Sequence, residues 1–200
     1  MVRRRMAMKV RNRTAMVLGV IVMPAVLATW VAASSQHQRV NQQSAIIAQF
    51  QKRIEGYMKV HKAAATQLPA LKSTASQAKI LEYQRALAAK IVAARPRATQ
   101  GEIFTLPIAA EFRRLIRTTM TGSRAGRIRS SLERGTPVKS NIEVNHSYPA
   151  VTPVETTPPS LLAGLPKLPT DLEYRVVDHD LVLHDVKADL VVDFLPAAIP

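Results

Sequence analysis

The chain has 200 residues, of which 47% are hydrophobic and 4% aromatic, and it carries a formal net charge of +14. It contains no cysteine, which excludes disulfides, thiolate metal ligands and a cysteine nucleophile. The 165 residues that follow a leader of 35 residues suffice for one modest domain or two small ones.

Residues 1–35 predict a signal peptide or a membrane anchor. Six bases and no acid precede a run from Thr14 to Ser35 that carries no charge. The apolar stretch Ala15–Ala33 has 19 residues. At about 1.5 Å per residue this length just spans a hydrocarbon layer of about 30 Å. The length therefore favours an uncleaved anchor.

Two features of the leader favour a cleaved signal instead. Pro24 would break or kink a helix at its middle. Val31-Ala32-Ala33 before Ser34 places small residues at the spacing that a signal peptidase reads. Both interpretations stay open here. In either case the basic flank stays cytoplasmic, so we expect the chain after Ser35 to be exported to the periplasm.

Charge divides the rest of the chain into two parts. Residues 36–134 hold 18 Lys and Arg against 5 Asp and Glu, whereas residues 135–200 hold 4 against 9. A shift of this kind is typical of a domain boundary. We therefore predict a basic helical region over 36–134 and an acidic region after it.

The basic region predicts three to four helices. Apolar residues recur every three or four positions from Val40 to Ala65, which indicates one helix. A second helix begins at Ser73 or Thr74 and stops before Arg95, because Pro96 follows. Its predicted inward residues are Ile80, Tyr83, Leu87 and Ile91. The short connection predicts that the two helices fold back as an antiparallel hairpin.

Two further helices complete this region. Thr105 is a plausible N-terminal cap, and Pro107 falls in the first turn, where its missing N–H costs nothing. Gly122 ends this third helix. A shorter helix over 125–134 stops at Gly135, a residue suited to a C-terminal cap.

The acidic region predicts strands and a linker. Alternating apolar residues predict one strand within 135–145. Six prolines between His146 and Pro169 predict a linker without a packed core over 146–171. Residues 172–200 predict a three-stranded antiparallel β-meander, with strands Leu172–Val177, Leu181–His184 and Asp189–Phe194. The predicted fold class is α+β.

Several short segments carry a resemblance to known proteins. They are Leu165-Pro-Lys-Leu-Pro169, Leu172-Glu-Tyr-Arg175, Asp180-Leu-Val-Leu183, Val191-Val-Asp-Phe194, Gly101-Glu-Ile-Phe104 and Phe112-Arg-Arg-Leu115. With these segments the chain resembles a family of uncharacterised exported bacterial proteins. The meander alone is similar to the C-terminal hairpin of small periplasmic proteins, including nickel/cobalt-homeostasis accessories. The resemblance implies export and no particular activity.

The densest group of metal-capable side chains lies in the meander. Its members are Asp178, His179, Asp180, His184 and Asp185. Imidazole and carboxylate together suit zinc, nickel or copper. In a strand, however, His179 and His184 point to opposite faces, since they differ by an odd number of residues. Aspartate is also common in turns for backbone reasons. We therefore predict a solvated turn, with no metal and no cofactor.

Catalytic patterns are weak. His61 lies on a predicted apolar face, where a core or interface histidine is the ordinary explanation. Glu102 and Glu111 are isolated carboxylates rather than an acid–base pair. Ser34 and Ser35 lack the glycine frame of a nucleophile elbow. We predict that the protein is not an enzyme.

The arginines of the basic region suggest a partner. The dense group is Arg113, Arg114, Arg117, Arg124, Arg127 and Arg129. Such a face binds polyanions, and outside the inner membrane these are anionic lipids or acidic proteins rather than nucleic acid. It also suits a solvated face or pairing with the acidic meander. Two functions follow: an envelope interaction module, or a periplasmic small-ligand or metal-binding accessory protein.

Overall fold

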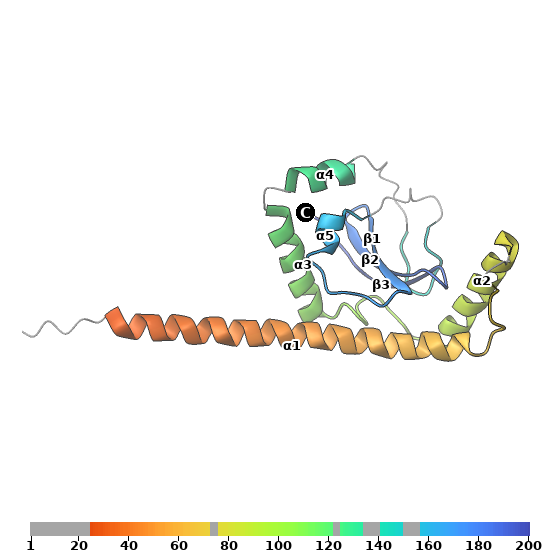
Figure 1. Cartoon of the computed structure of the whole chain (residues 1–200), viewed down its shortest axis with the longest axis horizontal. Coiled ribbons are helices and arrows are strands. Elements are labelled where there is room, and N and C mark those ends of the chain that lie inside the picture. The colour runs from red at the N-terminus through yellow and green to blue at the C-terminus, as the bar shows by residue number, and fades with distance from the viewer. Residues whose placement is uncertain (1–24, 73–75, 122–124, 134–140, 150–156) are drawn as a thin grey trace, which may run out of the picture. The chain divides into compact units, whose positions relative to one another are not determined.

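The computed structural model is α+β and describes residues 25–72, 76–121, 125–133, 141–149 and 157–200. The chain divides into two compact units, Met1–Arg39 and Val40–Pro200. The described elements, shown in Figure 1, are α1 (Ala25–Ala65), α2 (Gln77–Ala94), α3 (Leu106–Thr121), α4 (Ala125–Glu133), α5 (Pro159–Leu162), β1 (Leu172–Val177), β2 (Asp180–Asp185) and β3 (Leu190–Leu195). The predicted fold class is confirmed.

Helix α1 supplies one wall of the core of the second unit. Its apolar residues recur at helical spacing, and Phe50, Ile54 and Tyr57 are at most 5% exposed. Lys52 and Lys59, on its other side, are exposed. The predicted end of this helix is confirmed, and the helix is continuous back to Ala25.

Helix α2 begins after its N-cap residue Ser76. The predicted start falls on residues 73–75, which lie outside the described residues. The helix ends directly before Arg95, as predicted, because the proline that follows keeps this residue out of helical geometry.

The inward face of α2 was predicted correctly only in its second half. Leu87 and Ile91 are fully buried, whereas Ile80 is 39% exposed. Figure 1 shows α2 inclined to α1 rather than lying along it, so that the predicted hairpin is open. The first turns of α2 therefore lie away from the core, and Ile80 remains exposed.

Helices α3 and α4 follow the sequence pattern. Thr105 precedes α3, and its carbonyl accepts the N–H of Ala109 at 2.7 Å. Pro107 lies in the first turn, as predicted. The apolar residues of α3 form one stripe, each member at most 2% exposed: Ile108, Phe112, Ile116 and Met120. Helix α4 lies where a short helix was predicted, and its predicted stop at Gly135 lies outside the described residues.

The three strands form an antiparallel sheet in the order β1-β2-β3. Val177 pairs with Asp180 around a two-residue turn in which Asp178 has φ +54°. Asp189, in the turn before β3, has φ +48°. Aspartate tolerates this left-handed region better than most residues. The predicted meander is confirmed, with β2 one residue longer at each end, from Asp180 to Asp185, and with β3 one residue later than predicted, from Leu190 to Leu195.

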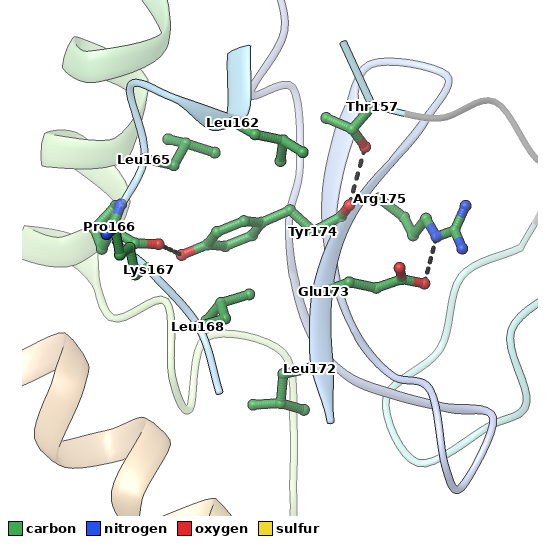
Figure 2. A pocket seen from close by; sticks show the side chains of 10 residues that line it. All are labelled: Thr157, Leu162, Leu165, Pro166, Lys167, Leu168, Leu172, Glu173, Tyr174 and Arg175. Atoms are coloured by element: carbon green, nitrogen blue, oxygen red, sulfur yellow. Dashed lines mark hydrogen bonds and ion pairs between the residues drawn. The ribbon is translucent and has the colours of Figure 1, made fainter. Parts of the chain in front are cut away.

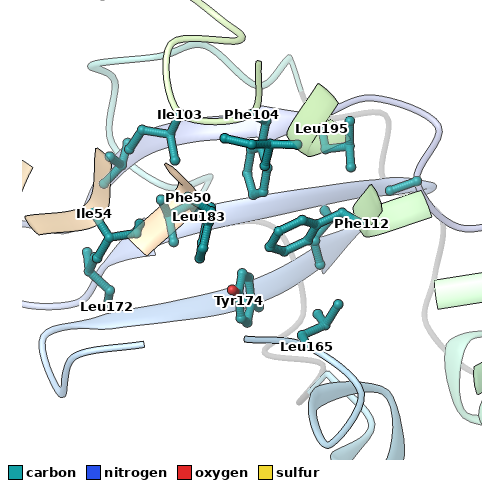
Figure 3. Close-up of a cluster of buried hydrophobic side chains, with 14 of the residues drawn as sticks. Phe50, Ile54, Ile103, Phe104, Phe112, Leu165, Leu172, Tyr174, Leu183 and Leu195 are labelled. Atoms are coloured by element: carbon teal, nitrogen blue, oxygen red, sulfur yellow. The ribbon is translucent and has the colours of Figure 1, made fainter. Parts of the chain in front are cut away.

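One face of the sheet packs against the helices around an aromatic cluster. Figure 3 shows Phe112 beside Tyr174 of the sheet, with ring centroids 6.0 Å apart. The ring centroids of Phe50 and Phe112 are 4.8 Å apart, and those of Phe104 and Phe112 are 5.1 Å apart. Basic helices and acidic strands share this core. The change of charge near residue 134 therefore runs through one compact unit rather than between two.

The predicted strand over 135–145 is wrong in its described part. Residues 135–140 lie outside the described residues, residues 141–143 belong to no strand, and Val144 and Asn145 form a turn. Asn145 has φ +66°, and the N–H of His146 donates to the carbonyl of Glu143 at 3.3 Å. This turn ends the extended geometry that a strand requires.

The residues after this turn pair with the edge of β3. The N–H of Asn145 donates to the carbonyl of Val191 at 2.9 Å, and Ser147 forms an antiparallel bridge with Leu190. Tyr148 then joins a small apolar cluster on the second face of the sheet, with Ile142, Val177, Val182 and Val191. This side of the sheet is therefore partly covered.

The prediction of a linker without a packed core is wrong for residues 157–171. Leu161 of α5 is fully buried and belongs to the main core. The Thr157 hydroxyl donates to the carbonyl of Tyr174 at 2.9 Å, and the Tyr174 hydroxyl donates to the carbonyl of Pro166 at 3.0 Å. The prolines fix the backbone, and the leucines between them pack. Residues 150–156 lie outside the described residues.

Candidate functional site

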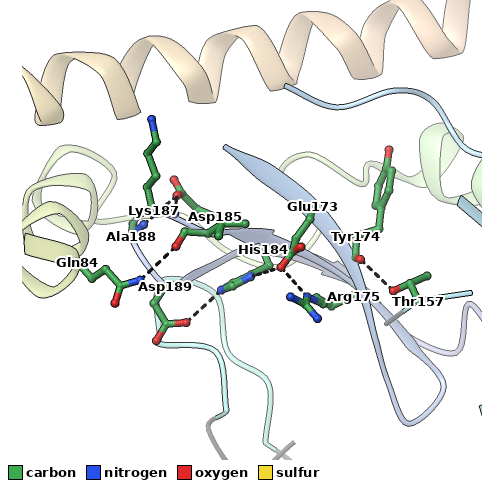
Figure 4. A network of polar contacts seen from close by, with 11 residues as sticks. Gln84, Thr157, Glu173, Tyr174, Arg175, His184, Asp185, Lys187, Ala188 and Asp189 are labelled. Atoms are coloured by element: carbon green, nitrogen blue, oxygen red, sulfur yellow. Dashed lines mark hydrogen bonds and ion pairs between the residues drawn. The ribbon is translucent and has the colours of Figure 1, made fainter. Parts of the chain in front are cut away.

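A buried polar network joins α1 to the turn after β2. Tyr57 and His61 lie four residues apart on one helical face. The Tyr57 hydroxyl donates to Asp185 Oδ2 at 2.6 Å, and His61 Nδ1 lies 2.6 Å from the same oxygen. Asp185 Oδ1 accepts the N–H groups of Lys187 and Ala188 at 3.0 Å (Figure 4). Both carboxylate oxygens are thus held in place.

The hydrogen bonds of this network favour the charged form of Asp185. Burial by itself raises the pKa of Asp185, but the hydrogen bonds from His61 and Tyr57 outweigh it and hold the pKa below its ordinary value. Burial raises the pKa of Tyr57, and the Asp185 charge acts in the same direction, so this hydroxyl stays a donor. His61 Nε2 lies 3.7 Å from an oxygen of Asp171, which pairs with Lys187 at 2.9 Å.

A second polar group centres on His184 (Figure 4). Its Nδ1 lies 3.0 Å from Glu173 Oε1, and its Nε2 lies 3.1 Å from Asp189 Oδ1. The Tyr148 ring lies over it, with ring centroids 4.8 Å apart. Arg175 pairs with the same Glu173 carboxylate. This histidine therefore links two strands and the turn before the third.

Asp193 of β3 fixes the loop 101–104 that precedes α3. Its carboxylate accepts the backbone N–H groups of Gly101, Ile103 and Phe104 at 2.9, 2.7 and 2.8 Å. Burial raises the pKa of Asp193, and these hydrogen bonds only partly oppose the rise. The residue is fully buried, so it holds loop 101–104 rigidly against β3.

A small cavity, the Arg95 pocket, lies beside this loop. It has a volume of about 230 Å³ and is lined by Arg53, Gly56, Tyr57, Val60, Arg95, Glu102 and Ile103. The Arg95 guanidinium lies over the Tyr57 ring, with Cζ 5.2 Å from the centroid. Arg95 Nη2 donates to Glu102 Oε2 at 2.8 Å and to the carbonyl of Val192 at 3.2 Å. Arg95 Nη1 is buried and has no hydrogen-bond partner among the described residues.

A shallower groove of about 380 Å³ lies beside the edge strand β1 (Figure 2). Its lining residues are Thr157, Leu162, Leu165, Pro166, Lys167, Leu168, Leu172, Glu173, Tyr174 and Arg175. The Tyr174 hydroxyl is already bonded to Pro166, and Glu173 is already paired with Arg175. The groove therefore offers mainly leucine side chains and the ammonium group of Lys167.

The five predicted metal-capable residues have separate roles. Asp185 belongs to the network with α1, and His184 links strands. His179 Nδ1 lies 3.0 Å from the carbonyl of Ile199, and Asp180 Oδ1 accepts the N–H of Ala197. Asp178 forms the turn between β1 and β2. Within the part of the chain that the structure describes, no group of three or more His, Cys, Asp or Glu is arranged to hold a metal ion.

The predicted arginine face is only partly free. Arg114 forms a two-bond ion pair with Glu111, and Arg113 donates to the carbonyl of Pro196 at 2.8 Å. Arg117 and Arg127 are exposed and have no ion-pair partner among the described residues. Arg124 and the side chain of Arg129 lie outside the described residues. The contact of this face with the meander is to a backbone carbonyl rather than to an acidic side chain.

The two carboxylates predicted as isolated each pair with an arginine. Glu111 is only 6% exposed, and its partner Arg114 lies on the same helix. Glu102 pairs with Arg95, which lies seven residues earlier in the chain. From the sequence, Arg95 is predicted only to follow the end of a helix. Its long-range contacts with Tyr57 and Val192 have no local signal in the sequence.

The predicted signal peptide or anchor falls largely outside the described residues, on residues 1–24. Among the helices that the structure describes, none is long and apolar enough to cross a membrane. The prediction for residues 1–35 therefore stays a prediction.

The chain matches no family model, no curated protein and no solved structure. The resemblance to exported bacterial proteins therefore stays a prediction, and a function has to be argued from the chain's own residues.

Proposed function

We propose that the protein is an exported envelope protein in which the unit Val40–Pro200 is an interaction module. The module faces the periplasm and is held at the inner membrane by the N-terminal segment. The basic residues before the apolar stretch stay in the cytoplasm.

The observation that carries this proposal is the charge pattern of the N-terminal segment. Six bases and no acid precede a run from Thr14 to Ser35 that carries no charge. The apolar stretch Ala15–Ala33 has 19 residues, enough to span a hydrocarbon layer of about 30 Å. Of the two interpretations of the leader, this length favours the anchor.

The buried ionisable residues favour interaction over catalysis. A catalytic acid, base or nucleophile has to reach a substrate. His61, Asp185 and Asp193 are at most 2% exposed, and each has hydrogen-bond partners within the core. Their arrangement suits the anchoring of helices on the sheet.

The partner surface that we propose is the exposed part of the arginine face, at Arg117 and Arg127. Two exposed guanidinium groups that form no ion pair within the described part of the chain suit an acidic protein surface. Such contacts weaken as salt rises, because added ions screen exposed charges.

The membrane topology is tested with single cysteines, since the natural chain has none. Thr118→Cys places a thiol at an exposed position of α3, and Val2→Cys is the matched control at the other end of the chain. In intact spheroplasts, a membrane-impermeant maleimide should label Thr118→Cys and should label Val2→Cys only after permeabilisation. The opposite pattern would refute the proposal.

The partner is tested by photo-crosslinking from position 118 in the intact envelope. Crosslinks to an acidic protein should be lost at high salt and in the double variant Arg117→Gln and Arg127→Gln. The control Lys52→Gln changes an exposed charge on α1 and should leave them unchanged. A different outcome is that no protein crosslink forms and the double variant loses binding to vesicles that contain phosphatidylglycerol. That outcome would identify the partner as lipid and contradict a protein partner.

A further inference from the structure

We propose that the Arg95 pocket binds a small organic monocarboxylate. The site is separate from the arginine face of α3 and α4, and its function does not depend on a membrane tether. Three features of the pocket indicate this ligand: an unused buried donor, an unfilled glycine position, and a net positive charge between apolar walls.

The unused donor is Arg95 Nη1. The Arg95 side chain is 9% exposed, and its other terminal nitrogen already donates to Glu102 and Val192. A buried N–H without an acceptor is costly, so native proteins rarely leave one. A guanidinium presents its N–H groups in a planar fork that matches the two oxygens of a carboxylate. A ligand oxygen in the pocket would provide the missing acceptor.

The unfilled position is Gly56, in the interior of α1. Glycine is less favourable than alanine inside a helix. A Cβ at Gly56 would meet no heavy atom within 4 Å, so close packing does not require glycine here. The missing side chain instead leaves the pocket open on the side of α1.

The charge and the walls define the ligand class. The lining holds two arginines and one carboxylate: Arg95 pairs with Glu102 Oε2, whereas Arg53 donates to the backbone carbonyl of Glu102 at 2.6 Å. The lining therefore has a formal charge of +1, which a monoanion would neutralise. Tyr57, Val60 and Ile103 form apolar walls that a bare inorganic anion would leave without contact. The volume of about 230 Å³ is below the range of about 300–1,000 Å³ typical of drug-sized ligands, so the apolar body must be short.

The test uses the purified full chain in detergent, benzoate as the probe and inorganic phosphate as the comparison. Isothermal titration calorimetry should give saturable binding of one benzoate per chain and weaker binding of phosphate. Gly56→Leu fills the pocket without touching Arg95 and should abolish binding. Arg95→Gln removes the donor and should weaken binding by about tenfold or more.

Two further variants separate a ligand site from a structural role. Glu102→Gln removes the competing carboxylate and should tighten benzoate binding, an effect that a purely structural ion pair would not produce. Arg97→Gln changes an exposed arginine outside the pocket and should leave binding unchanged. Far-UV circular dichroism confirms that each variant is folded before its binding is interpreted.

Three results would overturn the proposal. The first is the absence of saturable benzoate binding at tens of millimolar, which would mean that no ligand carboxylate reaches Nη1. The second is equal binding by the natural chain and by folded Gly56→Leu, which would place the ligand elsewhere. The third is phosphate binding as tight as that of benzoate, which would contradict the carboxylate class.

Discussion

His61 Nδ1 lies 2.6 Å from Asp185 Oδ2 and joins α1 to the end of β2 across 124 residues of sequence. The Tyr57 hydroxyl reaches the same oxygen, and the second oxygen accepts two backbone N–H groups from the next turn. One carboxylate therefore connects helix, strand and turn at a single buried point. This relationship makes Asp185 the residue on which the attachment of α1 to the sheet most depends.

Replacing Asp185 by Asn should strongly destabilise the compact unit. Removal of one partner from a buried, hydrogen-bonded charge network costs about 3–5 kcal/mol. Tyr57→Phe removes one hydrogen bond of the same network and should cost about 1 kcal/mol. Urea unfolding of the full chain, followed by far-UV circular dichroism, measures both. A smaller effect for Asp185→Asn than for Tyr57→Phe would contradict the central role of this carboxylate.

The same carboxylate predicts a loss of stability in acid. The folded-state pKa of Asp185 is below its ordinary value of 3.8, because the hydrogen bonds from His61 and Tyr57 outweigh burial. Its contribution is therefore fully present above pH 3.8 and is lost as the pH falls through the depressed folded pKa. Thermal melts between pH 5 and pH 2.5 should show a smaller acid-induced loss in Asp185→Asn than in the natural chain.

The folded-state pKa of Asp193 is shifted in the opposite direction to that of Asp185. Its folded-state pKa is raised by burial, so its contribution is fully present below pH 3.8 and is lost as the pH rises through the raised folded pKa. Because Asp193 is present in both chains, its effect cancels in their difference. An equal acid response in the two chains would show that Asp185 is not the titrating group.

Asp193→Ala should release loop 101–104. The variant leaves the N–H groups of Gly101, Ile103 and Phe104 without their acceptor, at a cost of about 1–3 kcal/mol for each group that remains buried. Amide hydrogen exchange should therefore lose protection first at these three residues. Protection at Leu87 in α2 is the internal control, since it should fall only with global stability. Unchanged protection at residues 101–104 would show that other contacts hold the loop.

Gly164 should not tolerate even a methyl group. A Cβ at this position would lie 2.5 Å from Thr119 Oγ1, whose hydroxyl is bonded to the carbonyl of Leu115. Gly164→Ala should destabilise the unit by about 1–3 kcal/mol through overpacking. Thr119→Ala removes the clashing oxygen and should recover most of this loss in the double variant.

The matched control for this cycle is Gly126→Ala in α4. A Cβ at Gly126 would meet nothing within 4 Å, so this change should be neutral or stabilising by up to about 1 kcal/mol. Urea midpoints for the four variants provide the comparison. Equal destabilisation by both glycine substitutions would point to a backbone effect rather than to the contact with Thr119.

Local rules predicted the elements that depend on local chemistry. Helical spacing and Pro96 located the end of α2, and the position of Pro107 located the start of α3. Alternation and turn aspartates located the three strands of the meander. These signals lie within a few residues of the structure that they specify, which explains why they sufficed.

The errors arose where contacts distant in sequence decide the structure. Proline content over 146–171 predicted a linker, yet Leu161 is fully buried and packs in the main hydrophobic core. Alternation predicted a strand through Val144, yet the positive φ of Asn145 turns the chain onto the edge of β3. His61 was correctly expected in a core or interface. Neither its partner Asp185 nor the role of Arg95 can be derived from the spacing of residues on one element.

Strand β3 is the last of the described elements, and two other segments of the unit are held in place by it. It carries Asp193, which fixes loop 101–104, and it pairs with residues 145–147. A premature stop codon before Leu190 would therefore remove both the anchor of loop 101–104 and the strand partner of residues 145–147. We expect quality-control proteases to degrade such a truncated product.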